Sequence, residues 1–572
     1  MSFIKQNISA ILMTVFIIVA VSIFYTPMYA YQEGLQIFMA NSEFFADTCL
    51  HPGGFSDYIG NFLVQFFMYP AYLVGILVLI IVGTQLITKQ IFKQYCKTST
   101  ADALAVVSGA AMMMAATEFN VMFGGCVAIF LAIAASAVTI KTDNKIVLCA
   151  LTPVVYFITG GWCTLIYISA VAIKFTIRQG LITVGINLAI LVFTSLIIKK
   201  ITNTFSVFDT FTGVQFNRYP DYSCATWYIA VALIVICILL AKLLSDIKSK
   251  LTTVIIYAAT LALPVIMVVK YDSGAMLDFS LDKMVRYKQW TKIIDTVKGK
   301  RYSTDLSLCY LNLALNELGI MDAKMFNFVQ LGTNGLASSV IDAQDKSIVN
   351  SEIYFRLGLM NIAERLSIEA MESINTFQKS ARMYKRLAEI AIIKNNKPLA
   401  IRYLKKLKDT LFYKAWANRA EEYINNPDKV EPLSDWKIEP LAFNNDFFFS
   451  EKYEDELFLH LLANNPHNIK VFNYYTGYLM LSKDIGKLYN FLSNYRTEDE
   501  LGIHVYEAIL LYLSQYKSDE FKRVMAEQND LTTRFQNFNN FMHSNNHDQN
   551  MAYQLFGNTY WYYYLSNMDK KY

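Results

Sequence analysis

The stretch from residue 26 to residue 60 holds the side chains that could most readily do chemistry. Its carboxylates, amide and imidazole come with no lysine or arginine between them: Glu33, Gln36, Glu43, Asp47, His51 and Asp57. Carboxylates without neighbouring cations need a metal ion, a proton or a cationic ligand to offset their charge. We take Glu33 and His51 as candidate catalytic residues and Gln36 as a candidate substrate-binding residue. The other three carboxylates are expected to be solvated or to cap helices, and a turn-stabilising hydrogen bond is the competing interpretation of His51.

A second candidate catalytic carboxylate, Glu118, stands in the turn Thr117-Glu118-Phe119-Asn120 between two apolar stretches. Ionisable groups at membrane depth are costly to bury and are functional candidates by default. The alternative is a carboxylate that caps a helix or lies in water at the membrane surface. The sequence leaves both interpretations open for Glu118 and Glu33. It also leaves the metal unassigned, with a divalent cation held by carboxylates as one option.

Aromatic residues alternate with polar ones in the stretch 203–223, around Arg218. Arg218, Tyr219 and Asp221 are candidate substrate-binding residues, because aromatic rings can stack a sugar and a guanidinium can pair a phosphate through two parallel hydrogen bonds. The simpler interpretation is a loop that packs against the soluble second half of the chain.

The elements that must position these residues are membrane spans in the first half of the chain. Only 15 of the 51 Lys and Arg residues and 10 of the 47 Asp and Glu residues lie in the first 270 positions. Stretches 146–158 and 162–173 are short for a bilayer, so they are either two spans or one broken pair. Nine apolar stretches predict about nine spans: 8–25, 61–88, 101–117, 121–140, 146–158, 162–173, 181–198, 225–240 and 251–269.

The distribution of cations predicts which side of the membrane each loop occupies. Cationic side chains near span ends stay preferentially in the cytoplasm. With nine spans, ten Lys and Arg residues fall in even-numbered loops and three in odd-numbered loops. This predicts a protein of the inner (cytoplasmic) membrane with a cytoplasmic N-terminus, outer loops at 27–60 and 200–224, and a periplasmic C-terminal half. The first stretch is expected to be an uncleaved anchor rather than a signal peptide, because its basic start is weak.

The second half of the chain, residues 271–572, is predicted to be a soluble α-solenoid on the outer face. One helix is expected over 380–394 and a second over 399–409, with Pro398 suited to its first turn. Such pairs resemble tetratricopeptide-type repeats, which bury their apolar faces by stacking on neighbours. The predicted fold class is therefore all-α, with a polytopic membrane domain over 1–270 followed by a helical-repeat domain. The aromatic run 560–564 is expected to pack the last helix, with docking on the membrane or on sugars as the alternative.

Several chemistries are excluded by missing motifs. The sequence has no Walker loop, no G-x-G-x-x-G followed by an acidic residue, no H-E-x-x-H and no G-x-S-x-G. It has no C-x-x-C, and most of its 8 cysteines lie in apolar stretches, which favours buried thiols over disulfides or zinc. The net charge of +4 comes from loops of the first half, so nucleic acid is not an expected partner.

The chain resembles a family of uncharacterised bacterial membrane proteins over nearly its whole length. The resemblance rests on the His51-Pro-Gly-Gly loop, the Thr117-Glu-Phe turn and the pattern Arg286-x-x-x-Trp290-x-x-Ile293 at the start of the helical half. That family carries no established activity, so the resemblance implies the architecture alone.

The first 130 residues are also similar to GT-C-type glycosyltransferases. The shared features are an acidic residue after the first span, Glu33, a His-Pro turn before the second, His51-Pro52, and a second acidic site at Glu118. The resemblance implies a polyprenyl-phosphate sugar donor and a carboxylate, here Glu33, as general base or metal ligand. Arg218 lies outside the part that the resemblance covers, and its role as a phosphate clamp is a hypothesis from the residues of its loop. The acidic pair common in those enzymes is replaced here by Glu33 alone.

Two functions follow as hypotheses for a protein embedded in the lipid bilayer of the cell envelope. The first is a GT-C-like glycosyltransferase that uses a polyprenyl-linked sugar and whose helical domain holds an envelope protein or polysaccharide acceptor. The second is a non-enzymatic scaffold that recruits protein partners through its helical repeats. A transporter fits less well, because the spans between 121 and 198 contain few ionisable groups.

Overall fold

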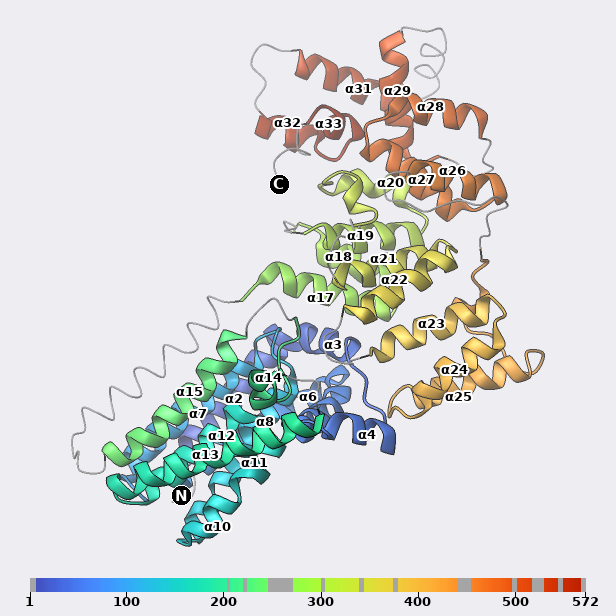
Figure 1. Cartoon of the computed structure of the whole chain (residues 1–572). Coiled ribbons are helices and arrows are strands. Elements are labelled where there is room, and N and C mark those ends of the chain that lie inside the picture. The colour runs from blue at the N-terminus through green and yellow to red at the C-terminus, as the bar shows by residue number, and fades with distance from the viewer. Residues whose placement is uncertain are drawn as a thin grey trace. The chain divides into compact units, whose positions relative to one another are not determined.

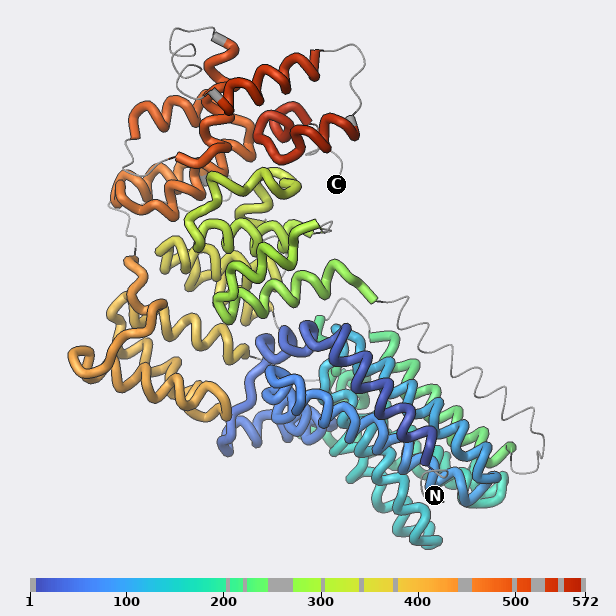
Figure 2. Tube along the Cα trace, turned by 180° about the vertical axis from the view of Figure 1, so that it is seen from behind, coloured from blue at the N-terminus to red at the C-terminus, as the bar shows by residue number. Residues whose placement is uncertain are grey.

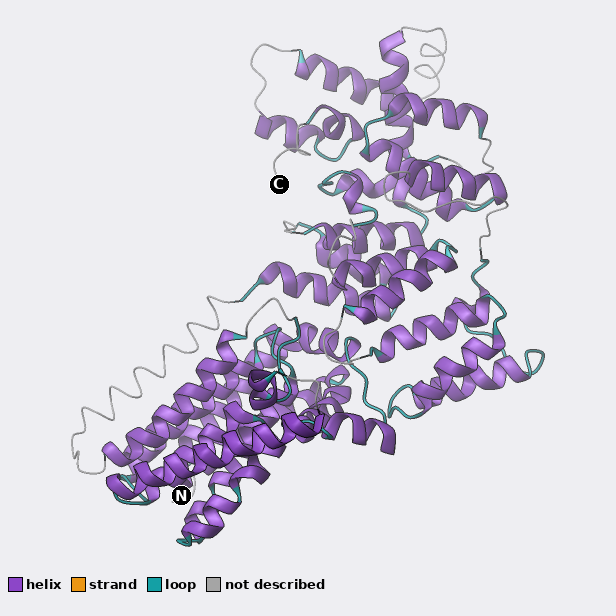
Figure 3. Cartoon of the chain, viewed as in Figure 1, coloured by secondary structure: helices purple, strands orange, loops and turns teal. Residues whose placement is uncertain are grey.

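The computed structural model of the chain is helical throughout the part that it describes (Figures 1 and 3). The described residues are 7–202, 206–219, 224–244, 271–299, 304–338, 344–373, 379–440, 454–495, 501–516, 529–543 and 549–566. Within these ranges the only pairing of extended backbone is an isolated antiparallel bridge between Val121 and Asn217. The all-α fold class is therefore confirmed for the described residues.

Six helices in the described ranges are long and apolar enough to cross a membrane, which fits a multi-pass membrane protein. They are Ile8–Gly34, Pro70–Phe92, Thr98–Ala116, Phe123–Lys141, Ile177–Ile201 and Ala225–Leu243. Two shorter apolar helices, Lys145–Thr159 and Gly161–Lys174, meet at Gly160, whose φ of +78° suits glycine. These two pack together, and Tyr167 Oη donates a hydrogen bond to the Leu148 carbonyl at 2.8 Å. The predicted ninth stretch, 251–269, lies outside the described residues.

The first apolar helix extends further than the sequence predicts. Helix α2 (Ile8–Ala20) continues through a π-helical segment, η1 (Val21–Tyr25), into α3 (Thr26–Gly34). Proline is tolerated in the first turn of a helix, and Pro27 lies at the start of α3. Glu33 therefore lies on the last turn of a helix rather than in a loop.

The segment that follows contains two short helices, α4 (Ser42–Cys49) and α5 (Gly54–Val64). The side chain of Asn41 accepts a hydrogen bond from Phe44 N at 2.8 Å and so caps α4. A turn of 3₁₀ helix, η2 (Gln65–Met68), separates α5 from α6 (Pro70–Phe92), because proline starts the new helix. The predicted second span, 61–88, is thus divided between α5 and α6.

The helices of this bundle share a polarity from one end to the other. At the end where α2 begins, Lys89 pairs with Asp102, and Ser9 Oγ donates to Asp102 at 2.9 Å. Lys174 and Lys242 bind helix-end carbonyls at the same end, with Lys242 Nζ 2.8 Å from the Ile173 oxygen. The opposite end holds Glu33, the turn around Glu118 and Gly160. Figure 2 shows the long helices running side by side between these ends.

The other described helices of the bundle follow along the first half of the chain. They are α7 (Thr98–Ala116), α8 (Phe123–Ser136), α9 (Val138–Lys141), α10 (Lys145–Ala150), α11 (Thr152–Thr159), α12 (Gly161–Lys174), α13 (Ile177–Thr202), α14 (Val207–Thr212) and α15 (Ala225–Leu243).

The chain divides into two compact units. The first is Met1–Met276 with Ile374–Lys385 and Arg402–Glu422, and the second is Leu277–Ser373, Arg386–Ile401 and Tyr423–Tyr572. Two short segments from the second half of the sequence therefore belong to the unit that holds the apolar helices. The predicted pair 380–394 and 399–409 is observed as α23 (Ala381–Ile393) and α24 (Lys397–Lys408), and each of these helices contributes residues to both units.

In the described residues, the second unit contains short helices, some of them joined in pairs by brief connectors. Helices α21 (Gln344–Arg356) and α22 (Met360–Glu372) form one such pair, joined through Gly358 at a φ of +90°. The aromatic run 560–564 packs the last described helix, α33 (Tyr560–Leu565), as the sequence indicates. Trp561 is fully buried, and its indole donates to the Glu507 carbonyl at 2.7 Å.

Other helices of the second half include α17 (Ser273–Arg286), α18 (Trp290–Val297), α19 (Asp305–Glu317), α20 (Met321–Lys324), α25 (Lys414–Asn425), α26 (Glu454–Asn464), α27 (Ile469–Leu481), α28 (Ile485–Asn494), α29 (Ile503–Tyr516), α31 (Asn529–Met542) and α32 (Gln549–Phe556).

Candidate functional site

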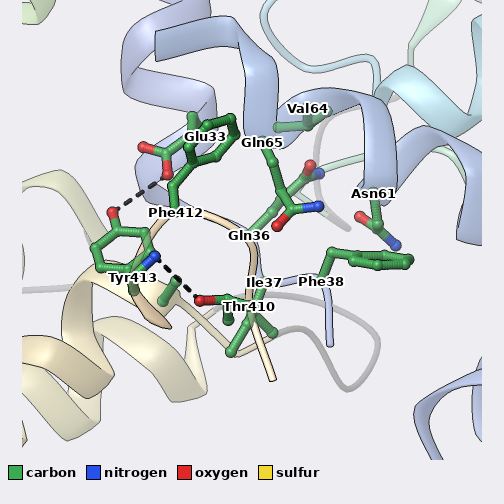
Figure 4. A pocket seen from close by; sticks show the side chains of 11 residues that line it. Glu33, Gln36, Ile37, Phe38, Asn61, Val64, Gln65, Thr410, Phe412 and Tyr413 are labelled. Carbon is green, nitrogen blue, oxygen red and sulfur yellow. Dashed lines mark hydrogen bonds between the residues drawn. The ribbon is translucent and has the colours of Figure 1, made fainter. Parts of the chain in front are cut away.

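Glu33, at the C-terminal end of α3, is buried and has a defined partner. Its side chain is 6% exposed. Tyr413 Oη, from the segment that follows α24, donates a hydrogen bond to Glu33 Oε1 at 3.2 Å (Figure 4). The two residues are 380 positions apart in the sequence, and both belong to the first unit.

Hydrogen bonds to backbone carbonyls hold the two late segments of the first unit against the end of α3 and the residues after it. Ser380 Oγ donates to the Gly34 carbonyl at 2.5 Å, and Ala381 N donates to the Gln36 carbonyl at 3.2 Å. Ala40 N donates to the Asp409 carbonyl at 2.8 Å. Backbone groups at and just after the end of α3, which have no partner within the helix, therefore form hydrogen bonds with distant parts of the chain.

A narrow pocket lies where these segments meet. Glu33, Gln36, Asn61, Gln65 and Thr410 supply its polar lining, and Phe38 and Phe412 are among its apolar walls (Figure 4). Gln36 Oε1 is buried there without a hydrogen-bond partner in the described residues. The space between the side chains is about that of one water molecule. As described, the pocket has no room for a sugar ring.

Glu118 and Arg218 lie elsewhere at the same end of the bundle, and each is close enough to Cys224 to interact with it electrostatically. Thr226 Oγ1 donates to Glu118 Oε2 at 3.4 Å. Arg218 is 3% exposed, its Nε donates to the Phe119 carbonyl at 3.2 Å, and its guanidinium lies 5.2 Å from the centre of the Phe119 ring. Burial lowers the pKa of Arg218, and neighbouring tyrosines partly offset this. Arg218 therefore holds the 118–121 turn, which belongs to the same half of the chain. The packing of its loop against the soluble domain stays a prediction.

The His51-Pro-Gly-Gly turn serves as a junction between segments. Gly53 N donates to the Phe157 carbonyl at 2.9 Å, and Val214 N donates to the Pro52 carbonyl at 2.8 Å. Gly53 has a φ of +82°, which favours glycine there. The backbone of this turn thus ties α5 to α11 and to the segment after α14.

The structure brings together only some of the predicted site residues. Glu33 and Gln36 line one pocket, whereas His51, Glu118, Arg218 and Tyr219 are not among the residues that line it. Asp221 lies outside the described residues. Within the described ranges, no group of three or more His, Cys, Asp and Glu side chains could hold a metal ion.

Sequence reasoning missed Tyr413 and misjudged the environment of Asp57. Tyr413 carries no local signal, because only the tertiary fold brings it to Glu33. Asp57 is expected from the sequence to be solvated or to cap a helix; instead its side chain is 7% exposed, and α5 has no side-chain cap hydrogen bond. A usable signal was present: glycines and polar residues at 53, 57, 60 and 61 recur at helical spacing and mark one face of α5.

Comparisons with known proteins agree with the first resemblance. A family model described as "Family of unknown function (DUF6057)" matches residues 2–567. A search of curated proteins and a search of solved structures each returned no match.

Proposed function

The chain belongs to this family of unknown function, and from its geometry we propose that it is a non-enzymatic membrane-anchored scaffold of the bacterial cell envelope. The apolar helices anchor it in the inner membrane, and the helical second half recruits a protein partner. One observation carries the proposal: in the described residues, the side chains best suited to catalysis are used to hold the fold together. Glu33 binds Tyr413, Arg218 binds the Phe119 carbonyl and Glu118 binds Thr226.

The size of the pocket supports the same conclusion. A small-molecule site usually encloses most of its ligand and needs several hundred Å³. The pocket beside Glu33 has space for about one water molecule, and Glu118 is not among its lining residues. A base must reach the acceptor hydroxyl within hydrogen-bond distance, and the pocket beside Glu33 leaves no room for a sugar that carries such a hydroxyl.

The proposed arrangement in the envelope follows the distribution of cations. Lys89, Lys174 and Lys242 lie at the end of the bundle where α2 begins, and we assign that end to the cytoplasm. With 251–269 as a ninth span, the second half is periplasmic, where its helix pairs form a tetratricopeptide-like solenoid. Such repeats present an extended surface that suits a protein partner.

A GT-C-like glycosyltransferase is the second candidate, because one observation favours it. Glu33 and Gln36 share a pocket at the far end of the first apolar helix from the assigned cytoplasmic end. A polyprenyl-phosphate sugar would approach that end from the outer leaflet. In this alternative Glu33 is the general base, Glu118 is a second carboxylate, and the helical half holds the acceptor.

Lipid-linked sugar analysis separates the two candidates. A deletion strain is complemented with the natural chain, Glu33→Gln or Glu118→Gln, and its lipid-linked sugars and envelope glycans are compared. The scaffold predicts unchanged glycans in every strain, with a partner that crosslinks to the natural chain and to both variants. A lipid-linked sugar that accumulates in the deletion strain and in Glu33→Gln at normal expression would replace the scaffold with the enzyme.

A further inference from the structure

Asp57 on α5 is a buried carboxyl group in an unusual environment. Its side chain is 7% exposed, and Asn61, one turn further along α5, donates from Nδ2 to Asp57 Oδ2 at 3.0 Å. The other oxygen, Oδ1, is buried without a hydrogen-bond partner in the described residues. A buried carboxylate with one oxygen left unpaired loses its hydration without full compensation.

The tight contact between α5 and α8 explains why water is kept from this group. A Cβ atom on Gly60 would lie 2.4 Å from Gly124 N, and a Cβ atom on Gly124 would lie 2.8 Å from Asp57 Oδ1. The two glycines therefore let the helix backbones approach closely, and Oδ1 faces the backbone of α8. Phe216 lies against the same glycine, 3.2 Å from that hypothetical Cβ.

No described cation compensates Asp57, and none of the described ion pairs includes it. Among the helices packed on α5, α8 and α11 carry only Cys126 and Tyr156 as titratable groups. The titratable groups of the neighbouring helices α3 and α4 are carboxyl groups, phenols and a thiol, none of which can carry a positive charge: Tyr29, Tyr31, Glu33, Glu43, Asp47 and Cys49. The nearby segment 206–219 carries Asp209, Arg218 and Tyr219, and the Arg218 guanidinium lies over Phe119. Cys49 is close enough to Asp57 for the two to interact electrostatically.

We propose that Asp57 is a proton-binding site, occupied by a proton when α5 packs against α8 and emptied when that contact loosens. A proton fits better than a metal ion, because a metal needs several oxygen ligands and Asn61 presents its NH₂ group to the carboxyl. Burial raises the pKa of Asp57 to about 7, and the hydrogen bond from Asn61 partly offsets this. Protonation removes the buried negative charge and turns the carboxyl group into a hydrogen-bond donor.

The sign of the pH dependence follows from this. The ordinary pKa of an Asp side chain is 3.8, and the packed state raises it to about 7, so the packed state binds the proton more tightly than the open state. Asp57 therefore stabilises the packed state fully when the pH is below its ordinary pKa. That stabilisation is lost as the pH rises through the pKa of the packed state. The α5–α8 contact therefore weakens toward alkaline pH.

Infrared spectroscopy of the full chain in lipid nanodiscs tests the site directly. With ¹³C-labelled aspartate, the carbonyl band of a protonated Asp side chain should be present near neutral pH and should titrate away toward alkaline pH. Asp57→Asn should abolish this band. The matched control Asp47→Asn, an exposed carboxylate on α4, should leave the band unchanged.

Thermal unfolding gives a second readout that does not depend on spectroscopy. Relative to the natural chain, Asp57→Asn should raise Tm by several degrees at about pH 9 and change it much less at about pH 4. Absence of the protonated band in the natural chain, or its survival in Asp57→Asn, would overturn the proposal. A titration midpoint that moves with sodium concentration would assign the site to a cation instead.

Discussion

At the residue scale, several charged side chains of this protein are buried and are held by fixed partners. Glu33 is held by Tyr413, and Arg218 by a carbonyl and a ring. In the second unit Arg356 is 8% exposed, pairs with Glu352 at 2.9 Å and with Asp435 at 2.8 Å, and lies over the Trp290 ring. Removal of one member of such a set leaves the others buried and uncompensated.

The Tyr413–Glu33 hydrogen bond contributes measurably to the stability of the first unit. We expect Tyr413→Phe to lower the free energy of unfolding by about 1–2 kcal/mol, because a buried carboxylate oxygen loses a donor. Thermal unfolding in detergent measures this, and Tyr72→Phe, a tyrosine 59% exposed on α6, is the matched control. Equal losses in both variants would contradict the assignment.

Arg356 is expected to matter more, because its partners are buried carboxylates. Arg356→Ala should lower the free energy of unfolding of the second unit by about 3–5 kcal/mol. Denaturant unfolding followed by tryptophan fluorescence measures this change. The control Arg365→Ala removes an exposed i,i+4 pair with Glu369 and should cost about 0.5 kcal/mol or less. Similar costs for the two variants would show that the buried set contributes no more than a surface pair.

Lowering the pH should weaken the buried ion pairs of Arg356. Burial raises the pKa of Asp435, but Arg356, Lys288 and Arg386 outweigh this and lower it below its usual value. Its stabilisation is therefore present above the unfolded pKa and is lost as pH falls through the lower folded value. Denaturant unfolding should show this acid-dependent loss in the natural chain and a smaller loss in Asp435→Asn.

At the element scale, close helix packing decides where the polar groups lie. Gly60 and Gly124 bring α5 and α8 into backbone contact, and Gly160 allows α12 to follow α11 directly. Each glycine is needed for a stated geometric reason, either close approach or positive φ. At Gly75 on α6, by contrast, a Cβ atom would meet no described neighbour within 4 Å.

Gly60→Ala is therefore expected to disrupt the α5–α8 contact. Its Cβ would lie 2.4 Å from a backbone nitrogen that cannot move without its helix. We expect the free energy of unfolding to fall by about 2 kcal/mol or more, which would appear as a lower Tm and a broader size-exclusion peak. Gly75→Ala should leave Tm unchanged or slightly higher, since alanine favours helix by about 1 kcal/mol. A Gly60→Ala protein with the natural Tm would contradict the packing.

At the scale of the whole molecule, the position of three lysines along the bundle has the widest consequences. Lys89, Lys174 and Lys242 lie at one end, where Asp102 and Asp143 pair with the first two. The other end holds Glu33, Glu118 and Arg218, and α13 ends there in Lys199 and Lys200. Because cytoplasmic ends retain Lys and Arg, the position of the three lysines predicts the orientation of the protein in the membrane.

A reporter that fluoresces only in the cytosol tests that orientation. Fused after Tyr572, it should stay dark, whereas a fusion ending at Lys97 should fluoresce. Fluorescence from the Tyr572 fusion would place the second half in the cytoplasm, and the proposed periplasmic scaffold would have to be abandoned.

The sequence by itself determined the helical class and the membrane character of the first half. Long apolar runs can cross a bilayer only as structures that satisfy their own backbone hydrogen bonds, so a local pattern was enough. The helix pair 381–408 followed from apolar spacing and from Pro398 in the same way. The end of the first helix was not predictable, because Pro27 is compatible with both a helix start and a break.

Only the tertiary structure decided what the candidate residues do. Glu33 was visible as an unaccompanied carboxylate, but its partner Tyr413 lies 380 residues away, and no local rule connects them. Asp57 looked like a surface acid until α8 was in place, because its burial depends on two glycines from different helices. Spacing along one helix shows which residues share a face, whereas desolvation depends on what covers that face.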